Sequence, residues 1–514
     1  MASTLPPRPH IDHLRRQARD LLRALRAADP AALARAAPYR TGATPQLAGA
    51  QLVVAREYGF ASWPRLLQEL ERRTNAGLSD ADFVQRVLTL ALGNGLQAPQ
   101  PLRAGALLQG RRLEPASPAT PALLLVQGDL PGAQQALAGS DVQAPLPPMQ
   151  VPALAYAAGS SLARLPALCP GLVATVQWLL GQGADPNTRW ADPARPDEKM
   201  PVLYSAVSRA GCFDTVQALL RAGADPNDQE SLYHATEQAD RRIIAALVQA
   251  GARWQGTNAL YRQLDHDNIE HLRQVLDLGA DVHERGPGGS GPLHHAILRG
   301  RSVDFVQLLL ARGADPAALD DQGRSPAALA SRLGDTATAA ALAAQGHSAP
   351  QDPRSRFLAA CAAADGAAAR AHLTFHAGAI TTLDAQALRL LPDQAQRGRL
   401  ESVRLMLQLG WPVAARGDWH ASALNQAAFR GDATMVQLLL GHGARWNETN
   451  GFGGNALGSC LHAGINQPDP TGDYAAVLAL LLADGAPVPA ATQAWPDELQ
   501  AVVADWSGAA PRRP

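Results

Sequence analysis

Lysine is almost absent from this sequence. Of the 45 basic residues only Lys199 is a lysine, and it lies in the loop-like stretch RPDEKMP. A phosphate-binding loop needs Gly-Lys-Ser/Thr, and protein kinases and pyridoxal-phosphate enzymes each need a lysine placed within their fold. The sequence therefore excludes these classes of site, and we expect no cofactor.

Cysteine, net charge and long apolar runs are also scarce. The four cysteines, at 169, 212, 361 and 460, form no Cys-x-x-Cys pair, so we expect reduced thiols and neither a disulfide framework nor a zinc site. The formal net charge of −1 argues against nucleic acid as a partner, because proteins that bind it carry a basic excess. No apolar run approaches the ~20 residues of a membrane helix, and the N-terminal residues lack the apolar core of a secretory signal. We expect a cytoplasmic monomer with no membrane partner.

A short signature recurs along the chain, in which Gly-Ala-Asp or a variant of it follows a leucine-rich stretch. Its glycine occupies positions 183, 223, 251, 279, 313, 410, 443 and 485. Weaker copies place Gly346 and Gly378 between them, so that the steps from 279 to 443 are 34, 33, 32, 32 and 33 residues. A fixed period of this length indicates stacked structural repeats, each too small to bury its own apolar face.

The second half of the repeat lies upstream of each signature and is clearest in residues 289–316, GSGPLHHAILRGRSVDFVQLLLARGADP. Looser copies occupy residues 200–211, 323–335 and 420–432. The sequence resembles the ankyrin repeat, G-x-T-P-L-H-x-A-A-x-x-G-H, at Pro292, Leu293, His294, Ala296 and Gly300. This resemblance extends over about residues 153–487. It implies helix-turn-helix units in which His294 bridges neighbouring repeats by hydrogen bonds.

The residue types fit the same fold on physical grounds. Serine or threonine before proline caps an inner helix and begins it, and triplets of valine and leucine form the buried stripe of an outer helix. The signature glycine supplies the left-handed residue that ends the outer helix. We therefore predict an all-α solenoid of about ten stacked repeats behind an N-terminal helical cap.

We divide the chain into four parts: an N-terminal helical leader (1–78), degenerate helical repeats (79–152), the repeat array (153–490), and a C-terminal capping helix with a tail (491–514). The leader contains an amphipathic helix over residues 11–28, whose apolar side is formed by Leu14, Ala18, Leu21, Leu22 and Leu25. It resembles the leader that precedes ankyrin arrays in bacterial proteins. A basic amphipathic helix also suits a membrane surface or nucleic acid, but an array needs an end cap with one polar face.

No catalytic or metal-binding residue is predicted. Histidines gather at 266, 271, 283, 294 and 295, without the spacing by which two ligands share one helix face. The sequence GPGGSG at 286–291 has the glycine spacing of a dinucleotide-binding motif, Gly-x-Gly-x-x-Gly. That motif follows a strand, whereas a helix-loop signature precedes GPGGSG, so we do not predict a nucleotide site here. Insertions lengthen the array at 160–171, 193–201 and 466–473. They are either loops that determine binding specificity or surface loops that the fold tolerates.

The predicted function is a scaffold that binds a partner protein on the concave face of the array. Counting along the inner helices places an arginine near their ends, and the loop before 420 adds an aromatic tip. The predicted partner-binding residues are Arg209, Arg299, Arg397, Arg430, Phe429, Asp418 and Trp419. Arginine beside exposed aromatics is typical of binding hot spots, although an arginine-biased composition also places arginine at any exposed position. Two alternatives stay open: an effector delivered to a host cell, and an enzyme whose site lies in the insertions near 160–201 or 455–473.

Overall fold

The computed structural model describes residue 5 and residues 11–39, 47–93, 98–109, 120–191, 197–286, 289–466, 468–489 and 495–506. These residues form helices joined by short turns, apart from one small two-stranded sheet. The predicted all-α repeat solenoid is confirmed. No described helix is both long enough and apolar enough to cross a lipid bilayer.

Contacts divide the chain into two compact units, residues 1–11 with 55–286, and residues 12–54 with 287–514. The first unit contains these elements: α4 (Trp63–Ala76), α5 (Asp80–Leu92), α6 (Pro101–Leu108), α7 (Thr120–Gln127), α8 (Leu130–Ala136), α9 (Ala153–Ala158), η2 (Ser161–Arg164), α10 (Cys169–Gly181), β1 (Arg189–Ala191), β2 (Lys199–Pro201), α11 (Val202–Ser205), η3 (Ala206–Ala210), α12 (Phe213–Arg221), α13 (Ser231–Ala235), α14 (Arg242–Gln249), α15 (Ala259–Asp265) and α16 (Ile269–Asp277). The division into four parts made from the sequence is a different one and stays a prediction.

The second unit contains these elements, of which α3 continues into the first: α1 (Ile11–Arg26), α2 (Pro30–Ala36), η1 (Ala37–Tyr39), α3 (Leu47–Glu57), α17 (Pro292–Leu298), α18 (Val303–Ala311), α19 (Pro326–Arg332), α20 (Thr336–Ala344), α21 (Pro353–Ala362), α22 (Gly366–Phe375), α23 (Ala385–Leu388), α24 (Leu390–Gln396), α25 (Leu400–Gln408), η5 (Asp418–His420), α26 (Ala423–Arg430), α27 (Ala433–Gly441), α28 (Ala456–Asn466), α29 (Tyr474–Ala483) and α30 (Asp497–Asp505).

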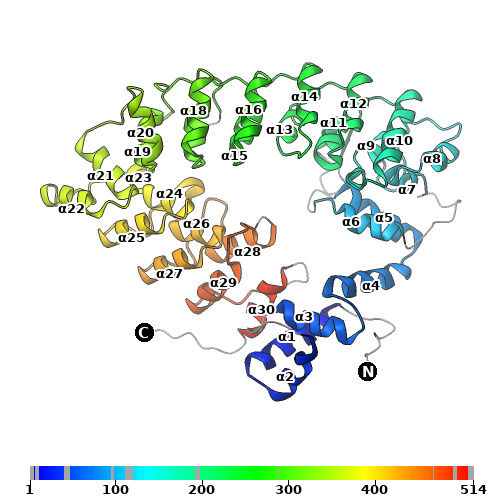
Figure 1. Cartoon of the computed structure of the whole chain (residues 1–514), viewed down its shortest axis with the longest axis horizontal. Coiled ribbons are helices and arrows are strands. Elements are labelled where there is room, and N and C mark those ends of the chain that lie inside the picture. The colour runs from blue at the N-terminus through cyan, green and yellow to red at the C-terminus, as the bar shows by residue number, and fades with distance from the viewer. Residues whose placement is uncertain are drawn as a thin grey trace. The chain divides into compact units, whose positions relative to one another are not determined.

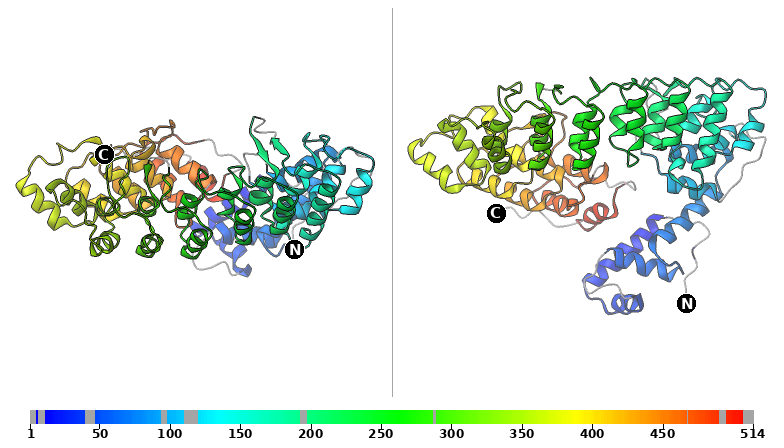
Figure 2. Two further views of the ribbon diagram at one scale, coloured as in Figure 1. Left: turned by 90° about the horizontal axis from the view of Figure 1, so that it is seen from above. Right: turned by 45° about the horizontal axis from the view of Figure 1, so that its top comes forward.

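Within each unit the helices form stacked pairs, a shorter inner helix followed by an outer one (Figure 1). Inner helices contact inner helices, as α24, α26 and α28 do, and outer helices contact outer ones. Figure 2 shows this stacking from two other directions. Each pair therefore buries its apolar face against the next pair, as expected for a repeat array.

The eight glycines of the main signature all end outer helices as predicted. Their φ angles lie between 86° and 98°, a left-handed backbone that costs a residue with a Cβ about 1–2 kcal/mol. Gly346 does the same with φ 89°. The prediction that Gly378 ends an outer helix in the same way is wrong, because this glycine lies in the turns after α22 and its backbone is not left-handed.

The insertions also take a definite form. Residues 160–168 and 468–473 lie between paired helices as expected, whereas residues 169–171 begin α10 and Asn466 ends α28; Gln467 is outside the described residues. In the predicted insertion at 193–201, residues 193–196 are outside the described residues, and Lys199–Pro201 form β2, which pairs antiparallel with β1, with Trp190 opposite Met200. This hairpin projects beyond the neighbouring helices in the left panel of Figure 2.

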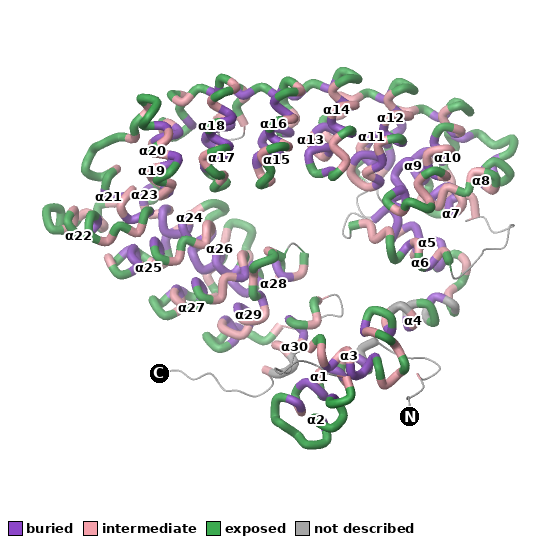
Figure 3. Tube along the Cα trace, in the orientation of Figure 1, coloured by how far each residue is buried: buried purple, intermediate pink, exposed green. Residues whose placement is uncertain are grey.

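Buried residues line the facing sides of neighbouring helices (Figure 3). One continuous apolar cluster of the second unit runs from Phe357 in α21 to Leu499 in α30, which is 2 % exposed. The five predicted apolar residues of α1 are all buried. In the same unit, Arg15 in α1 forms an ion pair of 3.1 Å with Asp497 in α30, and Gln51 donates to that carboxylate at 2.8 Å.

Candidate functional site

The repeat built from α26 and α27 carries most of the predicted partner-binding residues. Ser422 and Asn425 form a capping box that begins α26, with Asn425 N donating to Ser422 Oγ at 3.3 Å and Ser422 N donating to Asn425 Oδ1 at 3.1 Å. The helix ends at left-handed Gly431, φ 71°, so that Phe429 and Arg430 occupy its last turn. Phe429 is 39 % exposed, and its ring stacks on His462 in α28 with 6.3 Å between centroids.

Arg430 lies against the preceding repeat, where a Cβ added to Gly398 would meet its terminal nitrogen at 3.2 Å. Its Nε is buried without a hydrogen bond, and no ion pair with a described residue involves its guanidinium. Hydrogen bonds from Thr471 and, more weakly, the charge of Arg430 lower the pKa of the nearby Asp469 carboxyl. Packing thus holds the guanidinium in place, and no described residue accepts from its Nε.

The loop tip before α26 presents an exposed tryptophan. Arg389 donates to Asp418 Oδ1 at 2.6 Å, which anchors the tip, and Trp419 has φ 53° and is 58 % exposed. The Trp419 carbonyl accepts from Gly451 N at 2.6 Å. The next loop tip is thereby joined to this one.

That next tip carries Phe452, which is 80 % exposed and which the sequence analysis missed. Its backbone N–H donates to Asn450 Oδ1 at 3.0 Å, as does that of Gly454 at 2.9 Å. An aromatic residue between the glycines of GFGG, at a tip equivalent to that of Trp419, was the available signal. The structure thus adds Phe452 and His462 to the predicted residues around α26.

Two other predicted residues of the second unit lie at the end of α17. Arg299 is its exposed C-cap. Arg397 donates to the carbonyls of Ile297 and Leu298 at 3.0 and 2.6 Å, and burial lowers the pKa of its guanidinium. Arg397 is therefore occupied within the molecule, and we do not include it in a partner-binding surface.

Arg209 belongs to the first unit and is likewise occupied. It donates to the Leu92 carbonyl at 2.5 Å, and its guanidinium lies 4.8 Å from the centroid of the Trp190 ring. Its own carbonyl accepts from Arg164 Nε at 2.9 Å. These contacts hold η3 in place, so Arg209 has a structural role in the first unit.

The histidines behave as the repeat pattern implies. His294 Nε2 lies 2.9 Å from the Arg324 carbonyl, which links α17 to the loop before α19 and confirms the predicted bridge between repeats. Burial lowers the pKa of His266 and of His271.

Among the residues that the structure describes, no three His, Cys, Asp or Glu side chains lie close enough to hold a metal ion. Pro287 and Gly288 of the GPGGSG motif are outside the described residues.

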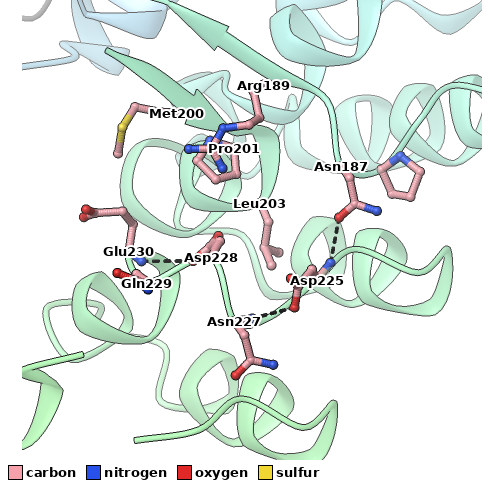
Figure 4. Close-up of a pocket in the computed structure, with 11 residues that line it drawn as sticks. Asn187, Arg189, Met200, Pro201, Leu203, Asp225, Asn227, Asp228, Gln229 and Glu230 are labelled. Carbon is pink, nitrogen blue, oxygen red and sulfur yellow. Dashed lines mark hydrogen bonds between the residues drawn. The ribbon is translucent and has the colours of Figure 1, made fainter. Parts of the chain in front are cut away.

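The enzyme alternative predicts a pocket at an insertion, and a hollow of about 730 Å³ does lie beside the β1–β2 hairpin. Its polar groups are drawn in Figure 4. Asn187 Oδ1 accepts from Asp225 N at 2.8 Å and Asp225 Oδ1 accepts from Asn227 N at 2.9 Å. Asp228 in turn accepts from the backbone of Glu230 at 3.0 Å. These groups stabilise the turns between repeats and do not pair a nucleophile with a base, so the hollow gives this alternative no support.

Comparison with known proteins agrees with the architecture. Residues 288–321 match the family model described as "Ankyrin repeat", and residues 391–440 match "Ankyrin repeats (many copies)". The 2-5A-dependent ribonuclease of Homo sapiens is 36 % identical over 76 residues, which are 15 % of this chain and 10 % of the relative. Protein phosphatase 1 regulatory subunit 27 of Homo sapiens is 35 % identical over 74 residues, 14 % of this chain and 47 % of the relative.

A putative E3 ubiquitin-protein ligase of Arabidopsis thaliana is 34 % identical over 100 residues, 18 % of this chain and 26 % of the relative. The chain thus spans less than half the length of each of these three proteins. The likeness covers repeats, which indicate protein–protein interaction, and not a whole enzyme. Together with the stacked helix pairs and their glycine-terminated outer helices, the two family matches identify this chain as an ankyrin-repeat protein.

Proposed function

We propose that this chain is a scaffold that holds a partner protein on the inner surface of the repeats around α26. The surface consists of Trp419, Phe429, Arg430 and Phe452, which we call the α26 surface, with Arg299 as a further contact. The partner contributes acidic groups to Arg430 and an apolar segment to the three aromatic rings.

One observation carries this proposal: α26 and the two joined loop tips beside it expose three aromatic side chains, and α26 ends in an arginine that no described residue pairs. Exposed aromatic and arginine side chains are the residue types enriched in binding hot spots. A carboxylate that approaches the terminal nitrogens of Arg430 would gain charge-assisted hydrogen bonds. Packing against Gly398 also limits the rotamer freedom that binding would otherwise cost.

The test compares two double variants by affinity purification from the lysate of the native host. Trp419→Ala/Arg430→Glu changes the α26 surface. Phe375→Ala/Arg221→Glu is the matched control, because it removes a still more exposed ring and reverses an exposed arginine on outer helices elsewhere. A protein retained by the wild type and the control should be lost with the first variant.

The retained protein is then purified, and its affinity for each form is measured by calorimetry. We expect the α26 variant to bind at least about tenfold more weakly, which corresponds to about 1.4 kcal/mol. Equal affinities for both variants would contradict the proposal, provided that circular dichroism finds both folded.

A further inference from the structure

Two of the four cysteines lie in contact although they are 43 positions apart in the chain. Cys169 is the first residue of α10, and Cys212 is the residue immediately before α12. These are the outer helices of consecutive repeats in the first unit, and they pack side by side (Figure 1). The two Sγ atoms are 3.5 Å apart.

This separation is the van der Waals contact of two sulfur atoms, and a disulfide bond has a length of about 2.05 Å. Closing the remaining ~1.5 Å needs side-chain rotation and a small helix shift, not a rearrangement of the repeats. The contact also has a route to solvent, because Cys212 is buried while Cys169 is partly exposed. The pair is therefore both close enough to join and accessible to a small reagent.

The other two cysteines provide an internal contrast. Cys361 and Cys460 are fully buried, and burial raises the pKa of each thiol to about 12. The Cys460 thiol donates to the Tyr474 carbonyl at 3.6 Å. Because buried structural thiols are inert, neither should react under conditions that oxidise the first pair.

We propose that Cys169 and Cys212 form a reversible dithiol–disulfide site whose oxidant is a small-molecule disulfide of the glutathione type. The thiolate of one cysteine attacks a sulfur of oxidised glutathione and releases one glutathione thiolate. The second cysteine then attacks the mixed disulfide and releases the other. Two protein thiols and one glutathione disulfide thus become one protein disulfide and two glutathione thiols, with two electrons passing from the protein.

The new bond would lie beside an existing link between the same repeats. Arg164, in the insertion that precedes α10, donates to the carbonyls of Arg209 at 2.9 Å and Ser208 at 3.0 Å. These hydrogen bonds already bring the insertion close to η3. A disulfide at 169 and 212 makes this attachment covalent, so we expect oxidation to fix residues 160–168 more firmly on the following repeat and to slow their amide exchange.

The test uses the full chain in glutathione buffers that run from fully reduced to fully oxidised. After acid quenching and denaturation, thiols are counted and cross-linked peptides are mapped by mass spectrometry. We expect two of the four thiols to be lost together, in one intramolecular link between the peptides of Cys169 and Cys212. Reducing the protein with dithiothreitol should restore all four.

Cysteine variants test which two residues form the disulfide. Cys169→Ser and Cys212→Ser should each abolish the link and leave at most one glutathione adduct, and the corresponding alanine variants should do the same if the serine variants unfold. Cys361→Ser/Cys460→Ser should keep the link. Four thiols that persist in oxidised glutathione, a bond that joins two chains, or a bond to Cys361 or Cys460 would each overturn the proposal.

Discussion

At the scale of single residues, the guanidinium of Arg397 has defined partners, whereas no described residue pairs with that of Arg430. Arg397 donates to two carbonyls at the C-terminal end of α17, where the helix dipole is negative and favours a cation. Arg430 is packed on Gly398 with its Nε buried and unpaired. Arginines at equivalent places in the repeat therefore serve stability in one case and, by our proposal, recognition in the other.

This difference predicts that substitution by alanine lowers stability at Arg397 and weakens partner binding at Arg430. Arg397→Ala should lower the free energy of unfolding by about 1–3 kcal/mol, because two carbonyls lose a charged donor. Arg430→Ala should change it by no more than about 0.5 kcal/mol while weakening partner binding. Urea unfolding followed by circular dichroism measures the first quantity, and a larger loss for Arg430→Ala than for Arg397→Ala would refute the assignment.

A pH dependence follows from the environment of Cys169. Burial, then the hydrogen bond and charge of Cys212, raise the pKa of the Cys169 thiol to about 11. Only the thiolate reacts with iodoacetamide, so the rate of alkylation should still rise about tenfold per pH unit between pH 8 and 10, where a thiol of ordinary pKa, about 8.5, levels off. Peptide mass spectrometry at short times measures this rate, with Cys361 as the slow reference; a rate that levels off near pH 9 would contradict the raised pKa.

At the scale of helices and turns, glycines end both helices of the repeat built from α19 and α20, but under different constraints. Gly334 follows α19 with φ 73°, and a Cβ there would collide with the Ala362 carbonyl of the next repeat. Gly346 follows α20 with φ 89°, and nothing lies within 4 Å of its added Cβ. Both turns need a left-handed residue, but only the first also needs a close approach between repeats.

Alanine at these two positions separates the two constraints. Gly346→Ala should cost about 1–2 kcal/mol of unfolding free energy, which is the penalty of a left-handed residue with a Cβ. Gly334→Ala should cost about 1–3 kcal/mol more, because the neighbouring repeat must also move. Thermal unfolding of the two variants gives the comparison, and equal losses would mean that the repeats separate at Gly334 without cost.

At the scale of the compact units, the second unit contains both the first helices of the chain and the last. Asp497 of α30 forms an ion pair of 3.1 Å with Arg15 and accepts a hydrogen bond from Gln51 at 2.8 Å, and Arg19 donates to Gln500 at 3.5 Å. The basic side of α1 thus faces polar groups of the C-terminal helix within this unit. The predicted role of the leader as an end cap stays a prediction.

The contact can be tested by reversing one charge. Asp497→Arg should speed amide exchange in α1 and α30, because it removes an ion pair and a hydrogen bond and places like charges together. Glu498→Arg makes the same change of charge at an exposed neighbour and serves as the control. Arg15→Glu combined with Asp497→Arg should recover part of the protection, by about 0.2–1 kcal/mol for a partly exposed pair; no recovery would argue against the pairing.

Much of the architecture could be predicted because it follows from local chemistry. The period of the glycine signatures, the helix-capping residues and the leucine stripes are all short-range patterns, and every main signature glycine has the left-handed backbone that was expected. The prediction for Gly378 was wrong because a glycine flanked by alanines does not by itself mark the end of an outer helix. The pairing of Arg189–Ala191 with Lys199–Pro201 was missed because pairing of short strands depends on contacts that a polar, proline-rich stretch does not reveal.

The candidate surface could be predicted only in part. Trp419, Phe429 and Arg430 were visible as residue types at repeat-equivalent positions, whereas Phe452 becomes their neighbour through the hydrogen bond between two loop tips. The hydrogen bonds from Arg397 to the carbonyls of Ile297 and Leu298, and from Arg209 to that of Leu92, join positions about 100 residues apart or more. Spacing along the chain carries no information on such pairs.

The sequence by itself determined the repeat, its helices and the turns that end them, because each depends on residues within one period of the chain. Only the tertiary structure decided which arginines are occupied, which aromatic tips lie together and that Cys169 contacts Cys212. The physical reason is that these features arise between repeats. Stacking brings together side chains whose separation in sequence is set by the accumulated lengths of loops and insertions, and not by any local preference of the backbone.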